Sequence, residues 1–241
     1  MHRHHRKHTH EHTHERTHEH TADDSLEELR EALSAEFWDE RYAGTGRVWS
    51  GRPNQRLVEQ VADLTPGKAL DVACGEGGDA IWLADQGWKV TAVDVSEVAL
   101  SKVAQHADEA GLDEQIRLGL YDALADPRPA GKHTFDLVTV SFLHVPEPDF
   151  ADIYRGIAEA VAPGGRLLVT AHHPEDVATG ARHDHGPGLL FEPERVLDTL
   201  SVGAPGSPWE VEVVDTPVRE QQTDEGPMSV RDTVVRLRRR A

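Results

Sequence analysis

The residues with the clearest chemical meaning lie in one short stretch, LDVACGEGGD, at positions 70–79. An apolar run ends there in Asp71, and three glycines follow within a few positions. Glycine has no Cβ, so a ligand can approach the main chain closely at such a loop. A second apolar run ends in Asp94, where a carboxylate can accept hydrogen bonds from both hydroxyls of a ribose. This pattern predicts a site for a cofactor that contains a nucleoside.

Two kinds of cofactor fit this pattern, a dinucleotide and S-adenosylmethionine, and GEGGDA even satisfies the G-x-G-x-x-A motif of dinucleotide sites. Asp71 separates the two, because a carboxylate at that point would repel a pyrophosphate and attract the ammonium of a methionine tail. Asp122, in LYDAL, follows a third apolar run, where a carboxylate can accept a hydrogen bond from an adenine amino group. The residues therefore favour S-adenosylmethionine.

The order of the predicted strands and helices gives the fold class. Apolar strand-like runs alternate with helical runs, which is typical of an α/β fold with a doubly wound, mostly parallel sheet and helices on both faces. We expect strands within 68–73, 89–96, 116–123, 135–144 and 165–173, and a helix over 149–162. The segments WEVEVVDT and TVVRLRRR have no helical pattern between them, so they are predicted to pair as an antiparallel hairpin that completes a seven-stranded sheet.

Several helix ends are also predicted from capping residues. Ser25, with Glu28 three residues on, has the pattern of a capping box and is expected to begin the first helix. Gly87 is expected to end the helix after the glycine loop. Ser96 is expected to cap a helix that runs to about Ala110.

Two longer stretches carry a family resemblance, FWDERYAGTGRVWSGRPN and ALDVACGEGGDAIWLADQGWKVTAVDVS. With the features above, they resemble the class I S-adenosylmethionine-dependent methyltransferases. Within that class they are similar to the small-molecule branch that includes the tellurite-resistance and thiopurine-type enzymes. The resemblance covers most of the chain after Phe37 and implies a Rossmann-like core.

The resemblance also implies roles for individual residues. Asp71 would face the methionine amino group, and Asp94 with its neighbour Val95 would bind the ribose. The residues implied at the cofactor are Asp71, Ala73 (where the family has a glycine), Gly75, Gly77, Asp94, Val95, Asp122, Ala123 and Ser141. The residues implied at the substrate or in a covering lid are Trp49, Arg52, Asn54, His172 and His173. His144, at the end of the fourth strand, is the candidate catalytic residue.

The acceptor class follows from the chemistry of methyl transfer. The reaction is an in-line displacement, so positioning is the main task of the protein. A thiolate or a selenium or tellurium oxyanion attacks without a base, whereas an alcohol or phenol needs one, for which His144 is the first candidate and His172 or His173 the second. The resemblance points to soft nucleophiles of the first kind, and O- or N-methylation of a small metabolite is the alternative. The fourth strand ends in SFLH and not in an Asn/Asp-Pro-Pro-aromatic motif, which argues against the DNA amino-methylating enzymes.

The first residues have a different composition. Nine of the sixteen histidines lie in the first twenty positions, among polar residues without apolar periodicity. We expect residues 1–24 to be a disordered tail and 25–241 a single domain, with N-terminal helices and lid in 25–64 and the Rossmann-like core in 65–241. Closely spaced imidazoles are ligands for Zn²⁺, Ni²⁺ or Cu²⁺, so we expect the tail to bind a divalent metal that catalysis does not need. The metal ligands expected there are His4, His8, His10, His12 and His14.

Composition limits the partners. A net charge of −18 disfavours nucleic acid, whose binding depends on Lys and Arg. The chain has no apolar run of membrane-spanning length and only one cysteine, Cys74, so we expect a cytoplasmic protein, monomeric or dimeric, with a small-molecule substrate. Two other classes rank lower, a nicotinamide-dependent oxidoreductase and a metal-binding protein without catalysis. No tyrosine has a lysine four residues later, so the short-chain dehydrogenase arrangement is missing.

Overall fold

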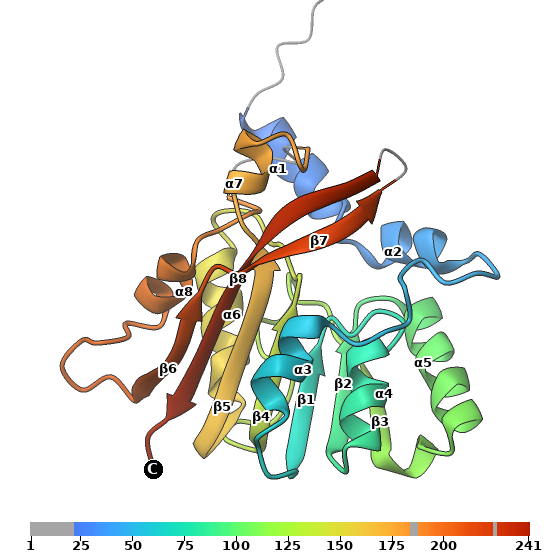
Figure 1. Cartoon of the computed structure of the whole chain (residues 1–241), viewed down its shortest axis with the longest axis horizontal. Coiled ribbons are helices and arrows are strands. Elements are labelled where there is room, and N and C mark those ends of the chain that lie inside the picture. The colour runs from blue at the N-terminus through green and yellow to red at the C-terminus, as the bar shows by residue number, and fades with distance from the viewer. Residues whose placement is uncertain (1–21, 184–187, 224–225) are drawn as a thin grey trace, which may run out of the picture.

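A computed structural model of the chain describes residues 22–183, 188–223 and 226–241. One sheet runs through the molecule, with helices on both of its faces (Figure 1). The strands are β1 (Lys68–Val72), β2 (Lys89–Asp94), β3 (Ile116–Leu120), β4 (Phe135–Ser141), β5 (Val161–His172), β6 (Trp209–Asp215), β7 (Val218–Thr223) and β8 (Gly226–Arg239). The α-helices are α1 (Ala22–Glu31), α2 (Ala35–Tyr42), α3 (Gln55–Val61), α4 (Gly78–Asp85), α5 (Glu97–Ala110), α6 (Phe150–Glu159), α7 (Glu175–Ala178) and α8 (Pro193–Thr199).

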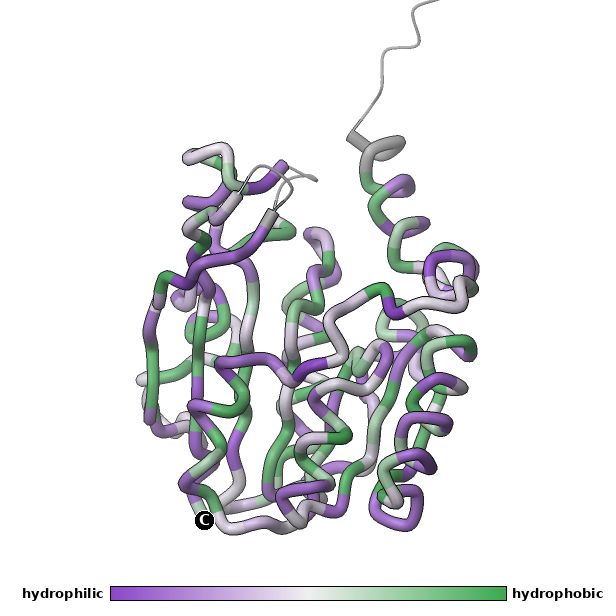
Figure 2. Tube along the Cα trace, turned by 45° about the vertical axis from the view of Figure 1, so that its right-hand side comes forward, coloured by the Kyte–Doolittle hydropathy of each residue, from purple (hydrophilic) through white to green (hydrophobic). Residues whose placement is uncertain are grey.

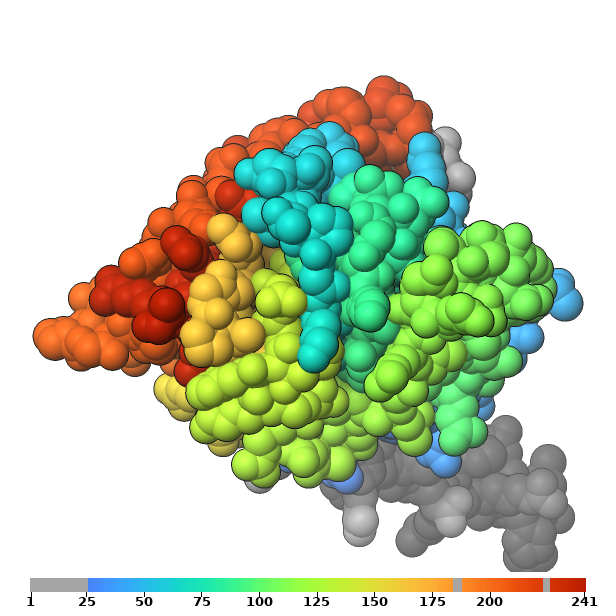
Figure 3. Space-filling view, turned by 90° about the horizontal axis from the view of Figure 1, so that it is seen from below, coloured from blue at the N-terminus to red at the C-terminus, as the bar shows by residue number. Residues whose placement is uncertain are grey.

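The strand order is β3-β2-β1-β4-β5-β8-β6, and β7 pairs only with β8. The pairs among β1 to β5 are parallel, and β8 runs antiparallel to both β5 and β6. This confirms the doubly wound fold and the antiparallel pairing of the last predicted segments. Seen from below in Figure 3, the C-terminal residues (red) lie beside β5 (gold), as this pairing requires.

One strand of this sheet was absent from the sequence prediction. The residues of β7, VREQQT, are mostly polar, so they carry no apolar run, and β7 extends the sheet only as a hairpin with β8. The path through the sheet has the seven strands expected, and β7 adds an eighth that pairs only with β8. Polar strands of this kind are held mainly by main-chain hydrogen bonds, which the apolar pattern of a sequence does not report.

Alternating strand residues contribute side chains to two hydrophobic cores, one on each face of the sheet. Leu70 and Val138 belong to one core, and their neighbours Ala69 and Leu137 belong to the other. All four are fully buried. The helices that cover the faces carry both polar and apolar residues, as Figure 2 shows along their turns, because each buries one side only.

Two of the three predicted helix ends are confirmed. Ser96 precedes α5 and its Oγ accepts a hydrogen bond from the Ala99 N–H (3.0 Å). Gly87 follows α4 with a φ of 91°, the left-handed conformation that favours glycine. The prediction for Ser25 is wrong, because α1 already begins at Ala22 and Ser25 lies within it. Acidic residues precede Ser25, and acidic residues are themselves favoured in a first helical turn.

Candidate functional site

The glycine loop joins β1 to α4 at the carboxyl end of the parallel strands. Gly75 and Gly77 have φ angles of 52° and 84°, and a Cβ on Gly77 would lie 2.9 Å from the side chain of Val103. Glycine is therefore required at position 77 both by conformation and by space. Ala73 also has a positive φ, 57°, which an L side chain tolerates only with strain.

Asp71 places a carboxylate beneath this loop. Its side chain is 1% exposed, and its Oδ2 is buried without a hydrogen-bond partner among the described residues. The carboxylate accepts one hydrogen bond from the N–H of Ala80 in the first turn of α4. Burial, together with the negative charges of Asp79 and Asp94, raises the pKa of Asp71 well above its ordinary value. A buried carboxylate with a spare oxygen fits a ligand that brings an ammonium group.

Asp94 lies at the end of β2, on the other side of the loop. Its Oδ2 accepts from the Gly75 N–H (2.8 Å) and its Oδ1 from the Ser96 N–H (3.0 Å). Burial raises the pKa of this carboxyl, and the main-chain hydrogen bonds act against that rise. Each carboxylate oxygen has a second lone pair, so Asp94 retains acceptor capacity for a diol. Val95, next in the chain, is half-buried.

The chain before α3 covers the glycine loop. The indole N–H of Trp49 donates to the Tyr42 hydroxyl (3.0 Å), and a Cβ on Gly75 would lie 3.0 Å from that same hydroxyl. Trp49 itself is 50% exposed. The main-chain oxygen of Arg52 lies over Gly78, while its side chain is exposed. Trp49 and Arg52 therefore lie beside the loop, as expected of a lid.

Three polar side chains meet where this covering segment joins α3. Asp79 Oδ1 accepts from the Asn54 N–H (2.6 Å), and Asp79 Oδ2 accepts from the Ser141 hydroxyl (2.8 Å). Asn54 Nδ2 donates to the same hydroxyl (3.3 Å). The triangle connects the lid, the glycine loop and the end of β4. Its centre, Asp79, was not among the predicted site residues.

Aromatic rings gather at the ends of β4 and β5. The rings of His144 and His172 stack with centroids 5.0 Å apart, and the Phe142 ring lies 4.4 Å from that of His172. His144 Nε2 accepts from the main-chain N–H of His172 (3.4 Å). Phe142 has a φ of 60°, a strained conformation for an aromatic residue, and such strain is concentrated at functional sites. The structure therefore brings His144 and His172 together.

Comparisons with known proteins agree with this geometry. Residues 69–165, which hold the glycine loop, match the methyltransferase domain family. The ubiquinone biosynthesis O-methyltransferase of Marinobacter nauticus is 32% identical over 145 residues. That match covers 58% of this chain and 58% of the relative, so the chain aligns with little more than half of the relative's length.

Solved structures show the same fold. A structure from work on the conversion of a disulfide bond into a thioacetal group during echinomycin biosynthesis has a TM-score of 0.68 at 23% identity, covering 86% of this chain and 92% of that one. TehB from Haemophilus influenzae has a TM-score of 0.60 at 20% identity, covering 86% of this chain and 67% of that one. Residues 69–165 are thus similar to a methyltransferase domain, and the chain shares the fold of these solved structures.

Not every residue predicted for the site has an environment specific to a ligand. Asp122 is exposed, and its Oδ1 caps the following turn by accepting from the Leu124 N–H (2.9 Å). Ala123 is half-buried against the core. His173 is not part of the ring stack of His144 and His172. Its Nδ1 accepts from the Glu175 N–H (3.1 Å) at the start of α7.

Two further residues of the candidate site, Asp79 and Glu76, were not predicted from the sequence. Both lie within the glycine-rich stretch, where an acidic residue could have been recognised from the sequence as a candidate site residue. Glu76 is 3% exposed, and its Oε1 pairs with Lys102 Nζ (2.9 Å). Their importance comes from contacts with residues more than 20 positions away, which no local pattern reports.

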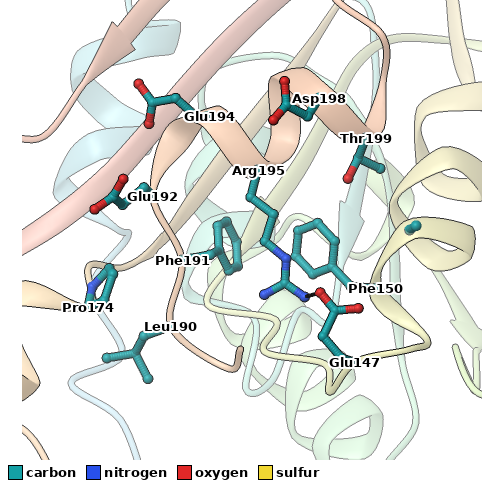
Figure 4. A pocket seen from close by; sticks show the side chains of 11 residues that line it. Glu147, Phe150, Pro174, Leu190, Phe191, Glu192, Glu194, Arg195, Asp198 and Thr199 are labelled. Atoms are coloured by element: carbon teal, nitrogen blue, oxygen red, sulfur yellow. Dashed lines mark hydrogen bonds and ion pairs between the residues drawn. The ribbon is translucent and has the colours of Figure 1, made fainter. Parts of the chain in front are cut away.

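Other features of the molecule lie away from this site. Figure 4 shows a pocket of about 450 Å³ beside α6 and α8, in which the Arg195 guanidinium stacks on the Phe150 ring (3.8 Å to the centroid) and pairs with Glu147. It shares no lining residue with the cofactor site. The tail histidines predicted to bind metal lie outside the described residues. Among the residues that are described, no three His, Cys, Asp or Glu side chains group as metal ligands would, and no helix has the length and apolar character to cross a bilayer.

Proposed function

We propose that this protein transfers a methyl group from S-adenosylmethionine to a small molecule, and that the acceptor is a soft nucleophile, either a thiol or a selenium or tellurium oxyanion. The observation that carries the cofactor assignment is the buried, unpartnered Oδ2 of Asp71 beside the glycine loop. An ammonium would complete its hydrogen bonding and balance its charge.

The chain holds the remaining parts of the cofactor with separate groups. Asp94 accepts from the ribose hydroxyls, with Val95 beside it, and Asp122 with Ala123 contacts the adenine. Gly75 and Gly77 let the ligand approach the main chain, and Trp49 lies over Gly75. When bound, the cofactor supplies an electrophilic methyl group on a sulfonium.

The environment of His144 supports an acceptor that is already ionised. In its neutral form imidazole has one nitrogen that accepts and one that donates. His144 Nε2 accepts from the main-chain N–H of His172, so this nitrogen is engaged within the protein. A nitrogen engaged in this way does not take a proton from a substrate. A thiolate or oxyanion needs no base.

O-methylation is the second candidate. It is favoured by the name of the Marinobacter nauticus relative, a ubiquinone biosynthesis O-methyltransferase. For a phenol or alcohol acceptor, one imidazole of the His144–His172 pair must turn its basic nitrogen toward the hydroxyl.

A methyl-transfer screen tests both candidates. Release of S-adenosylhomocysteine is measured against thiols, selenite, tellurite, phenols and amines at equal concentration. Turnover with thiols or chalcogen oxyanions is expected. Turnover confined to phenols or alcohols would replace the first candidate by the second, and turnover with none of these acceptors would contradict both.

A further inference from the structure

Asp79 lies next to Asp71, half-buried and outside the set of residues proposed to hold the cofactor. It lies in the first turn of α4, one residue before Ala80, whose N–H donates to the Asp71 carboxylate. The two acids are therefore neighbours at the carboxyl end of β1. The partners of Asp79 are the Asn54 N–H and the Ser141 hydroxyl, both neutral. These hydrogen bonds fix the Asp79 carboxylate without balancing its charge.

No cation of the described chain balances either acid. The groups that face the pair are neutral or negative: the Asn54 N–H from the lid, the Ala80 N–H from α4, the Ser141 hydroxyl from β4, the Asp94 carboxylate from β2 and the Cys74 thiol from the glycine loop. Like charges in one buried site oppose each other's ionisation. Burial, followed by the charges of Asp79 and Asp94, raises the pKa of Asp71. Burial also raises the pKa of Asp79, although its two hydrogen bonds limit the rise.

We infer that Asp71 and Asp79 form a two-carboxylate receptor that holds one proton in the free protein and exchanges it for the ammonium of the methionine tail. This inference rests on the proposed function and adds Asp79 to its cofactor site. In the exchange, one carboxyl O–H loses its proton to the solvent, and the ammonium donates hydrogen bonds to the two carboxylates. Asp71 Oδ2, which has no partner among the described residues, is the first acceptor. Asp79 supplies the second negative charge.

Titration calorimetry with S-adenosylhomocysteine tests the exchange without turnover. The full chain is titrated at about pH 7 in buffers of different ionisation enthalpy, because the dependence of the heat on the buffer gives the number of protons released. Wild type is expected to release about one proton for each ligand bound. 5′-Methylthioadenosine, a nucleoside thioether without an ammonium group, is expected to release none.

Two variants assign the proton to the pair. In Asp79→Asn the charge of Asp79 no longer opposes ionisation of Asp71, while burial and the Asp94 charge still raise the Asp71 pKa, so proton release is expected to fall below that of wild type. Asp85→Asn is the matched control, because it makes the same change at an exposed acid at the end of α4 and leaves both carboxylates of the pair, so proton release should persist. If Asp79→Asn does not fold, the inference is tested by comparing proton release on binding of S-adenosylhomocysteine and of 5′-methylthioadenosine to wild type.

The outcomes separate this inference from the proposed function. Binding of S-adenosylhomocysteine without proton release, or equal release from wild type and Asp79→Asn, would overturn the two-carboxylate receptor and leave the methyltransferase proposal intact. Failure of wild type to bind either S-adenosylmethionine or S-adenosylhomocysteine would overturn both.

Discussion

The Glu76 carboxylate in the glycine loop accepts a hydrogen bond from the main-chain N–H of Trp49 (3.0 Å). The same oxygen accepts from the Val48 N–H (2.9 Å), and the other oxygen pairs with Lys102. One buried side chain thus joins the loop, the lid and α5. Opening the lid therefore requires Glu76 to lose two main-chain hydrogen bonds.

Replacing Glu76 by Gln should lower the free energy of unfolding near pH 7 by about 1–3 kcal/mol, because a charged acceptor of buried hydrogen bonds is lost. Burial acts to raise the pKa of Glu76, but hydrogen bonds from Trp49, Lys102 and Val48 bring it below its ordinary value of 4.5. The folded state therefore binds this proton less tightly than the unfolded chain does. Its contribution is present above that ordinary value and is lost as the pH falls through the folded-state pKa.

Urea unfolding of wild type and Glu76→Gln at about pH 7 and about pH 4 measures this contribution. The difference between the two proteins should shrink at the lower pH. An equal difference at both values would show that the charge of Glu76 is not what stabilises the lid.

The backbone conformation of Ala73 indicates a substitution that should stabilise the protein. Its φ of 57° costs an L residue about 1–2 kcal/mol relative to the right-handed conformation. Ala73→Gly should therefore raise the free energy of unfolding, by about 1 kcal/mol after the greater entropy of glycine in the unfolded chain is subtracted. Ala104→Gly, on the exposed side of α5, is the opposite control and should lower it by about 1 kcal/mol. Destabilisation by both changes would refute strain at Ala73.

Most of the fold could be predicted from the sequence, because buried strands and helices have apolar residues at regular spacing. β1 and β4 supply residues to both cores, so their apolar runs were visible, and Ser96 was recognisable as a cap before α5. β7 has no such apolar pattern, because it is a polar strand that pairs only with β8 in a hairpin.

Site residues could be predicted only where their spacing along the sequence indicates a chemical role. Asp71 and Asp94 lie at the ends of β1 and β2, and their spacing in the sequence predicts acids that bind a nucleoside cofactor, so they could be named. Asp79 and Glu76 act through contacts with a lid that is distant in sequence, and only the folded chain reveals those contacts. The stacking of His144 on His172 likewise depends on β4 and β5 being neighbours.

His144 distinguishes the two acceptor classes. With a thiol or chalcogen oxyanion, His144→Ala should change the rate only through lost packing and orientation, by less than about 10-fold. With a phenol or alcohol, it should lower the rate by about 10²-fold or more, with cofactor affinity nearly unchanged. The measurement is the pH–rate profile of both proteins on the substrate found in the screen. A soft substrate with a 10²-fold loss that disappears at high pH would contradict the proposed role.

The His-rich tail should be separable from the enzyme. Deleting residues 1–20 is expected to abolish tight Ni²⁺ or Zn²⁺ binding at about pH 7.5, where imidazole is neutral, and to leave methyl transfer intact. Calorimetry with each metal and the methyl-transfer assay are run on the full and shortened chains. Loss of activity in the shortened protein would show that the tail contributes to the catalytic domain.

The most direct measurement is a calorimetric titration of wild type and Asp94→Asn with S-adenosylmethionine and with NAD. Asparagine keeps one acceptor oxygen for the main-chain N–H groups but removes the charge that binds the ribose hydroxyls. The account predicts that wild type binds S-adenosylmethionine at one site and does not bind NAD. It predicts that Asp94→Asn, folded to the same extent, binds S-adenosylmethionine with a loss of about 1.5–3 kcal/mol. Binding of NAD in place of S-adenosylmethionine, or an unchanged affinity in Asp94→Asn, would contradict it.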